Sequence, residues 1–114
     1  MTAPDCIFCK IACHEIPSTI VYENDYVMAF NDLNPVAPVH VLVIPKKHMD
    51  SIMAVDDYNY VVEIHKAIKE IAKICKIDET GFRVISNVGE DGGQSVKHLH
   101  YHVIGGTKLP EKLA

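Results

Sequence analysis

The spacing of apolar residues divides the chain into short strands and one long amphipathic helix. Residues 57–76 place apolar side chains at the three- and four-residue spacing of a helix, with two aspartates at its start and lysines in its later turns. Alternating or β-branched runs predict strands over 19–23, 26–30, 39–44, 82–87 and 98–104. Strands before and after a central helix predict an α+β fold with a mainly antiparallel, five-stranded sheet.

The segments between these elements carry turn and loop signals. Asn24 and Asp25 predict a hairpin turn between the first two strands. The two prolines of 31–38 predict a loop, and Gly81 ends the helical pattern. The chain has 114 residues without an internal repeat, a low-complexity tract or a linker, which predicts a single domain over 1–114.

Composition and charge narrow the class of partner. The net charge of −4 and the pI near 5.9 argue against a nucleic-acid binder, which usually carries a basic face. No apolar run approaches the roughly 20 residues that a membrane-spanning helix needs. The first residues lack the basic and apolar regions of a signal peptide. We therefore expect a cytoplasmic protein with neither nucleic acid nor membrane as its partner.

The four cysteines are expected to be thiols or metal ligands in such a compartment. Cys75 belongs to the apolar pattern of the helix and is most simply a core residue, while Cys13 is a spare thiol. Cys6 and Cys9 form a Cys-x-x-Cys pair, which alone fits a redox motif, half of a metal site or no function. A closed zinc site would need two further ligands.

Three histidines alternate in the last predicted strand. His98, His100 and His102 should share one face of it, because side chains alternate along a strand, and the apolar residues between them should face the helix. Alternate residues lie about 6.5–7 Å apart, so one zinc ion bound by all three would be strained. A neutral imidazole in the middle, flanked by helpers, suits nucleophilic attack on phosphorus better.

A glycine-rich loop over 89–95 precedes the histidines. Glycines let the backbone approach a phosphate closely and aim N–H groups at it, and the Ser95 hydroxyl can donate to a phosphate oxygen or to a leaving group. Such a loop alone is a weak signal. Next to three alternating histidines, it predicts anion donors beside a nucleophile.

The segment 92–104, GGQSVKHLHYHVI, resembles the signature of the histidine-triad family, and most closely its Hint branch of nucleoside phosphoramidate hydrolases. Upstream segments match in the same register at 7–8, 15–17, 29–32 and 38–48. The resemblance covers about residues 5–106. It implies the family's fold and a symmetric homodimer in which two such units form one continuous sheet.

The resemblance also implies roles for individual residues. His100 would be the nucleophile that forms a nucleotidyl-histidine, and His40 would orient or support the catalytic group. Phosphate and leaving group would be held by Asn87, Gly93, Gln94, Ser95 and His102. Asp32 would bind the ribose hydroxyls, because a carboxylate accepts from two vicinal hydroxyls. The purine pocket would comprise Ile7, Phe8, Phe30, Leu33 and Leu42, although ordinary core packing explains each of these residues equally well.

Many bacterial members of the family hold a structural zinc ion, and all four of the corresponding ligands are present here. They are Cys6, Cys9, His48 and His98. Other Hint proteins lack these cysteines and fold without metal. The resemblance therefore predicts zinc as a structural cofactor, with no cofactor needed for catalysis.

The function that follows is hydrolysis or transfer at the α-phosphate of purine nucleoside monophosphate derivatives, such as adenosine 5′-phosphoramidate. The intact third histidine favours hydrolysis, and the Gly-Gly-Gln-Ser loop favours amine-type leaving groups. A nucleotide-binding regulatory module with little turnover is the alternative from another class. A zinc-stabilised scaffold would leave the glycine loop unexplained. The physiological leaving group and the choice between adenine and guanine stay open.

Overall fold

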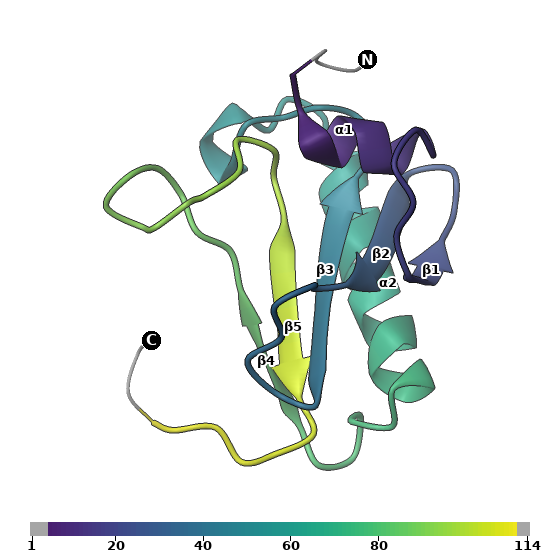
Figure 1. Cartoon of the computed structure of the whole chain (residues 1–114), viewed down its shortest axis with the longest axis vertical. Helices are drawn as coiled ribbons and strands as arrows, with labels where there is room; N and C mark the ends of the chain where they lie inside the picture. Colours follow the sequence, from purple (N-terminus) through teal and green to yellow (C-terminus); the bar gives the residue numbers. More distant parts are fainter. Residues whose placement is uncertain (1–4, 112–114) are drawn as a thin grey trace.

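The computed structural model describes residues 5–111, which form one sheet, two α-helices and a short 3₁₀-helix (Figure 1). In chain order the elements are α1 (Ile7–Ala12), β1 (Ile20–Glu23), β2 (Val27–Asn31), β3 (Val39–Pro45), η1 (Ile52–Ala54), α2 (Asn59–Ile74), β4 (Phe82–Ile85) and β5 (Tyr101–Gly105). The sheet has the order β1-β2-β3-β5-β4, and every neighbouring pair is antiparallel. The predicted α+β fold with a five-stranded antiparallel sheet is therefore confirmed.

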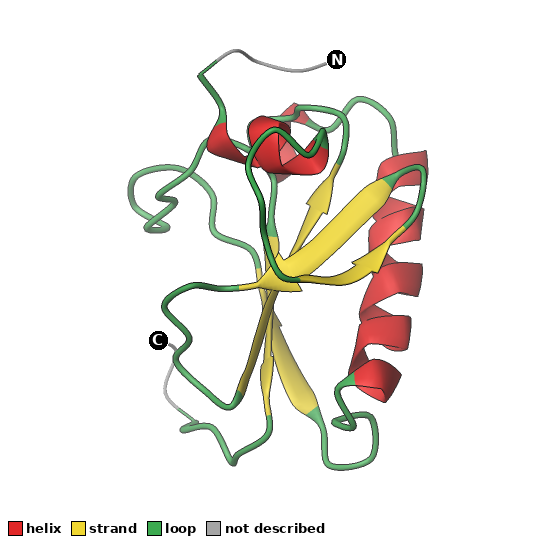
Figure 2. Cartoon of the chain, turned by 45° about the vertical axis from the view of Figure 1, so that its right-hand side comes forward, coloured by secondary structure: helices red, strands yellow, loops and turns green. Residues whose placement is uncertain are grey.

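The two faces of the sheet bury two separate apolar clusters. Val41 and Val43 of β3 face α2, which runs alongside the sheet (Figure 2). Leu42 and Ile44, the alternate residues of β3, face α1, which lies across one end of the sheet. Because β3 is covered on both faces, its residues 41–45 read as a continuous apolar run rather than as an alternating one.

The long helix follows its predicted face but is shorter at both ends. Its buried residues are Ile64, Ala67, Ile68, Ile71 and Ala72. Asp57 lies before the helix, where its carboxylate accepts from the Asn59 N–H at 3.0 Å. At the other end Lys76 adopts a left-handed conformation (φ 60°), and the Ile77 N–H closes back onto the Ala72 carbonyl at 2.9 Å.

The structure corrects the expected strand over 98–104, because β5 begins only at Tyr101. The Leu99 N–H donates to the Met49 carbonyl at 2.6 Å instead of joining the sheet. The faces nevertheless alternate as predicted: Leu99 and Val103 lie in the cluster under α2, and the histidines lie on the α1 side. The last strand before the glycine loop also ends earlier than expected, at Ile85.

Helix α1 is an element that the sequence pattern did not predict. It has six residues, too few for a periodic signal, and an isolated helix of this length is unstable in water. Its first turn is capped by Cys6, whose Sγ accepts from the Cys9 N–H at 3.2 Å. Packing of Phe8 and Ile11 onto the sheet supplies the rest of its stability. Among the described residues 5–111, no helix is long and apolar enough to cross a bilayer.

Candidate active site and metal cluster

His100 lies just before β5 and is held in one tautomer. Its Nδ1 lies 2.7 Å from the carbonyl oxygen of His98, which can only accept a hydrogen bond. The proton therefore sits on Nδ1, and Nε2 keeps its lone pair. The ring is almost fully buried, at 4% exposure for the residue, and the edge of Phe8 packs against it with centroids 5.1 Å apart. The neutral form of this ring therefore presents the lone pair of Nε2, which is the atom that an imidazole nucleophile uses.

His102 is held in the opposite tautomer through His40. The Val36 N–H donates to Nδ1 of His40 at 3.1 Å, so His40 carries its proton on Nε2. That Nε2–H donates to Nδ1 of His102 at 2.9 Å. His102 consequently presents an Nε2–H donor. His100 and His102 thus offer a lone pair and a proton, with ring centroids 5.2 Å apart.

Asp32 stands beside this pair of histidines. One carboxylate oxygen lies 3.3 Å from Nε2 of His40, and the other accepts from the Asn34 N–H at 2.8 Å. The side chain stays 20% exposed. Its carboxylate is therefore available to a ligand as well as to His40.

A pocket of about 290 Å³ joins these groups to an apolar wall. Nine of the predicted site residues line it: Ile7, Phe8, Phe30, Asp32, Leu33, Leu42, Ser95, His100 and His102. Phe8 and Phe30 meet edge to face within the wall, with centroids 5.7 Å apart. Ile11 and the segment 16–19 also line the pocket, and no motif in the sequence pointed to them. A small apolar cavity with a few convergent polar groups is typical of a ligand site.

Three predicted phosphate-binding residues do not line this pocket: Asn87, Gly93 and Gln94. The glycine loop bonds to itself rather than pointing its N–H groups outward. The Gly93 N–H donates to the Glu90 carbonyl, and the Gln94 N–H to the Gly89 carbonyl, both at 3.0 Å. Gly92 is required for this closure, because a Cβ there would lie 2.5 Å from the Val88 carbonyl oxygen. Contact of these three residues with a nucleotide stays a prediction.

Ser86 holds the backbone of His100, a contact that the sequence pattern did not predict. Its hydroxyl donates to the His100 carbonyl at 2.9 Å. The backbone of His100 is thus held on one side by Ser86, while the ring is held by the carbonyl of His98. A serine directly after a strand carries no signal of such a role.

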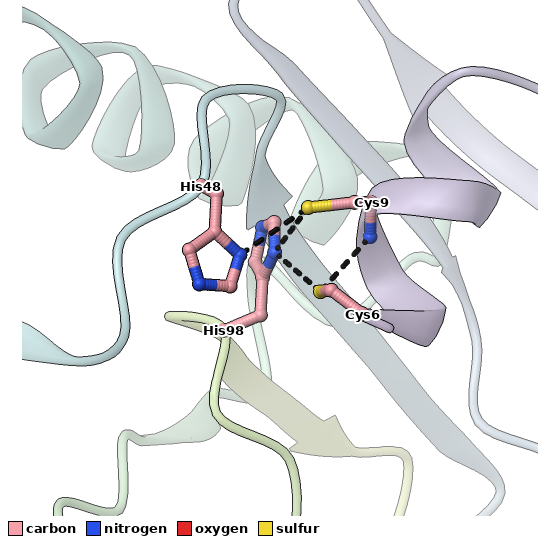
Figure 3. A group of neighbouring side chains, drawn as sticks. All are labelled: Cys6, Cys9, His48 and His98. Carbon is pink, nitrogen blue, oxygen red and sulfur yellow. Dashed lines mark hydrogen bonds between the residues drawn. The ribbon is translucent and has the colours of Figure 1, made fainter. Parts of the chain in front are cut away.

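The four predicted metal ligands come together at the start of α1 (Figure 3). Their ligand atoms all lie within 4.8 Å of one another. Nδ1 of His98 lies 3.1 Å from Sγ of Cys6 and 3.4 Å from Sγ of Cys9, and Nδ1 of His48 lies 3.2 Å from Sγ of Cys9. Two thiols and two imidazoles are a ligand set that suits a tetrahedral metal ion.

The outer nitrogens of both histidines meet acceptors. Nε2 of His98 donates to the Pro45 carbonyl, and Nε2 of His48 donates to the Asp50 carboxylate, each at 2.8 Å. In the neutral form of each ring, these bonds place the proton on Nε2 and leave Nδ1 as the atom that can bind a metal. Burial also lowers the pKa of His98 to about 4, which keeps its ring neutral.

Asp32, His40 and His102 form a second close group of potential ligands, which fails the same test. Nδ1 of His40 accepts from the Val36 N–H, so the proton of the neutral ring lies on Nε2. Nε2 is the atom that would have to bind the metal, and a protonated nitrogen cannot do so. The cluster of two cysteines and two histidines therefore suits a metal ion. The group of Asp32, His40 and His102 suits a chain of hydrogen bonds instead.

A hollow of about 400 Å³ opens beside the metal-ligand cluster and gives it access to solvent. Cys6 and His48 line it, together with Ile7 and Ser95, which also line the pocket of about 290 Å³ beside His100. The two sites are therefore direct neighbours.

These features define an α+β protein with three histidines between a ligand pocket and a metal-ligand cluster. The family model described as the HIT domain matches residues 13–109, and the chain belongs to this family. The family includes hydrolases and nucleotide-binding proteins.

Individual relatives agree with this assignment. A histidine triad protein from Clostridium difficile is 61% identical with a TM-score of 0.95, covering 99% of this chain and 100% of its own. A HIT family hydrolase from Clostridium thermocellum is 45% identical with a TM-score of 0.94, at the same coverage. Protein HitA of Neisseria gonorrhoeae is 44% identical over 89% of this chain and 95% of its own length.

The hydrogen-bond chain predicts how His102 titrates. Burial lowers its pKa below the usual 6.5, the neighbouring His100 and His40 lower it further, and Asp32 opposes them. At pH 7 His102 should be neutral with its proton on Nε2, which nitrogen-15 NMR of the ring can read. Because the unfolded chain binds this proton more readily, protonation should cost stability as the pH falls below about 6.5. An Nδ1–H tautomer, or a pKa above that of free histidine, would contradict the assignment.

Proposed function

We propose that the protein hydrolyses purine nucleoside 5′-phosphoramidates, with His100 as the covalent nucleophile. The observation that carries the proposal is the Nδ1–H bond to His98, which leaves a lone pair on Nε2 at the wall of the pocket. A module that only binds nucleotides has no need of such a group. The residues around the pocket supply the other parts of the reaction.

The apolar wall suits a purine base, and Asp32 suits the ribose hydroxyls. Nε2 of His100 attacks the α-phosphorus, the P–N bond breaks, and the amine leaves with its electron pair. In this reaction the Ser95 hydroxyl passes its proton to the leaving nitrogen, and the Nε2–H of His102 donates to a phosphate oxygen; both residues line the pocket. Water then attacks phosphorus and the N–P bond breaks, so that the nucleoside monophosphate is released. The proton that the water loses returns to the Ser95 oxygen and restores its hydroxyl.

We also propose that the metal is a structural zinc ion bound by Cys6, Cys9, His48 and His98. Thiolate ligands suit zinc and suit the reducing cytoplasm, where we place the protein. The ion would tie the start of α1 to the segment before β5. It takes no part in the chemical steps.

The proposed assembly is a homodimer that continues the sheet across β4. This strand ends the sheet and exposes Phe82 and Val84 at 38% and 42%. An open edge with exposed apolar side chains is a natural site for strand pairing. Light scattering measures the mass in solution, and a monomer at micromolar concentration would rule the dimer out.

The hydrolase proposal predicts that the protein releases AMP from adenosine 5′-phosphoramidate. His100→Ala should reduce kcat by at least about a thousandfold, because it removes the nucleophile, while AMP binding stays within about tenfold. The exposed His14→Asn, which keeps a residue tolerant of the left-handed backbone there (φ 65°), is the control and should act as the wild type does. AMP binding by a wild type that turns nothing over would favour the regulatory module instead.

The zinc proposal predicts one zinc ion per chain in protein purified without chelator. Cys9→Ser removes a buried ligand and should weaken zinc binding by at least about a hundredfold, measured by competition with a chromophoric chelator. The matched control is Cys13→Ser, since Cys13 is exposed four residues further along. Equal zinc retention by the two variants, or a metal-free wild type, would show that the cluster does not bind zinc.

A further inference from the structure

The side chain of Gln94 is fully engaged by backbone groups. Its Oε1 accepts from the Gly89 N–H at 2.9 Å. Its Nε2 donates to the Asp50 carbonyl at 2.6 Å and to the Val96 carbonyl at 2.9 Å. An amide has two N–H donors, and both are used here. A phosphate oxygen could bind Gln94 only by displacing one of these bonds.

The bond to Asp50 reaches the turn that carries a metal ligand. The Asp50 carboxylate accepts from Nε2 of His48, and the carbonyl of the same residue accepts from Gln94. In the same turn, the Met49 carbonyl accepts from the Leu99 N–H. Residues 48–50 thus hold the glycine loop and the segment before β5 together.

A second connection passes through His98. Its ring belongs to the metal-ligand cluster, while its carbonyl holds Nδ1 of His100. Phe8, which lies between the two cysteines in the sequence, packs edge-on against both rings, with centroids 6.0 Å from His98 and 5.1 Å from His100. The cluster is therefore connected to two groups of the proposed reaction: to His100 through the carbonyl of His98, and to Ser95 through Gln94.

We propose that Gln94 is a positioning residue that couples occupancy of the Cys6–Cys9–His48–His98 cluster to nucleotide binding, by tying the His48 turn to the loop that carries Ser95. This inference rests on the proposed function. A bound metal fixes His48, the Asp50 carboxylate follows it, and the Asp50 carbonyl then holds Gln94 and its loop in one place. Coupling between two sites is reciprocal, so a nucleotide must strengthen metal binding by the same factor.

The test measures AMP binding by calorimetry to metal-free and zinc-loaded protein, and zinc affinity with and without AMP. In the wild type, zinc should tighten AMP binding about tenfold, and AMP should tighten zinc binding equally, within the usual range of such couplings. Gln94→Met keeps the side-chain length but removes all three hydrogen bonds. It should still bind zinc, with the coupling factor reduced to near one.

The control variant is Glu90→Ala, at an exposed position of the same loop, and it should keep the wild-type coupling. Coupling that survives in Gln94→Met would overturn the proposal. So would an equal loss of AMP affinity in the metal-free and loaded variant, because that pattern marks a direct phosphate contact.

Two further readouts keep the test decisive. Circular dichroism shows whether the metal-free protein is folded. If it is unfolded, the rate of zinc transfer from loaded protein to a chelator is measured in place of the two affinities. AMP should slow this transfer in the wild type but not in Gln94→Met. If the wild type binds no AMP, the proposed function fails, and zinc transfer without nucleotide tests Gln94 alone. Faster zinc loss from Gln94→Met than from Glu90→Ala then supports the link to the His48 turn, and equal rates refute it.

Discussion

The hydrogen bond from Nδ1 of His100 to the carbonyl of His98 is the contact on which the rest of the site depends. At 2.7 Å it leaves no choice of tautomer, because a carbonyl cannot donate. The lone pair therefore stays on Nε2 of a side chain that lines a pocket with an apolar wall. Both residues are buried, so water does not compete for the bond. In the proposed reaction the protein does not need to reorganise before the nucleophile attacks.

His98 contributes to two neighbouring sites, the pocket beside His100 and the metal-ligand cluster. Its ring faces Cys6 and Cys9, and its carbonyl faces His100. Helix α1 completes the connection, because Phe8 lies between the two cysteines and packs onto the rings of both histidines. A six-residue helix has little stability of its own, so ligands at its first turn would stabilise the wall of the neighbouring pocket as well.

The sequence predicted those parts of the molecule that follow a local period. The face of α2 and the shared side of the three histidines follow from spacings of 3.6 and 2 residues, and the strands follow from alternating or β-branched runs. Helix α1 and the late start of β5 do not, because they depend on partners far along the chain: the apolar residues of β3 onto which α1 packs, and Met49 for Leu99.

In the candidate site, too, the sequence predicted some features and not others. Motif and resemblance indicated the pocket residues from Ile7 to His102 and all four ligands of the cluster. The partners that orient them were missed, namely Ser86, Asp50 and the carbonyl of Pro45. Backbone carbonyls and single hydroxyls carry no sequence signal, since every residue has a carbonyl. For Gln94 the motif suggested a phosphate contact, whereas its side chain is bonded to three backbone groups.

The stereochemical course at phosphorus distinguishes attack by His100 from direct attack by water. Hydrolysis of a single diastereomer of adenosine 5′-phosphoramidothioate in oxygen-18 water gives AMP phosphorothioate with a chiral, labelled phosphorus. Attack by His100 followed by attack of water is two in-line displacements, each inverting the phosphorus, so the account predicts net retention of configuration. Net inversion would mean a single displacement by water, and His100 would then not be the covalent nucleophile.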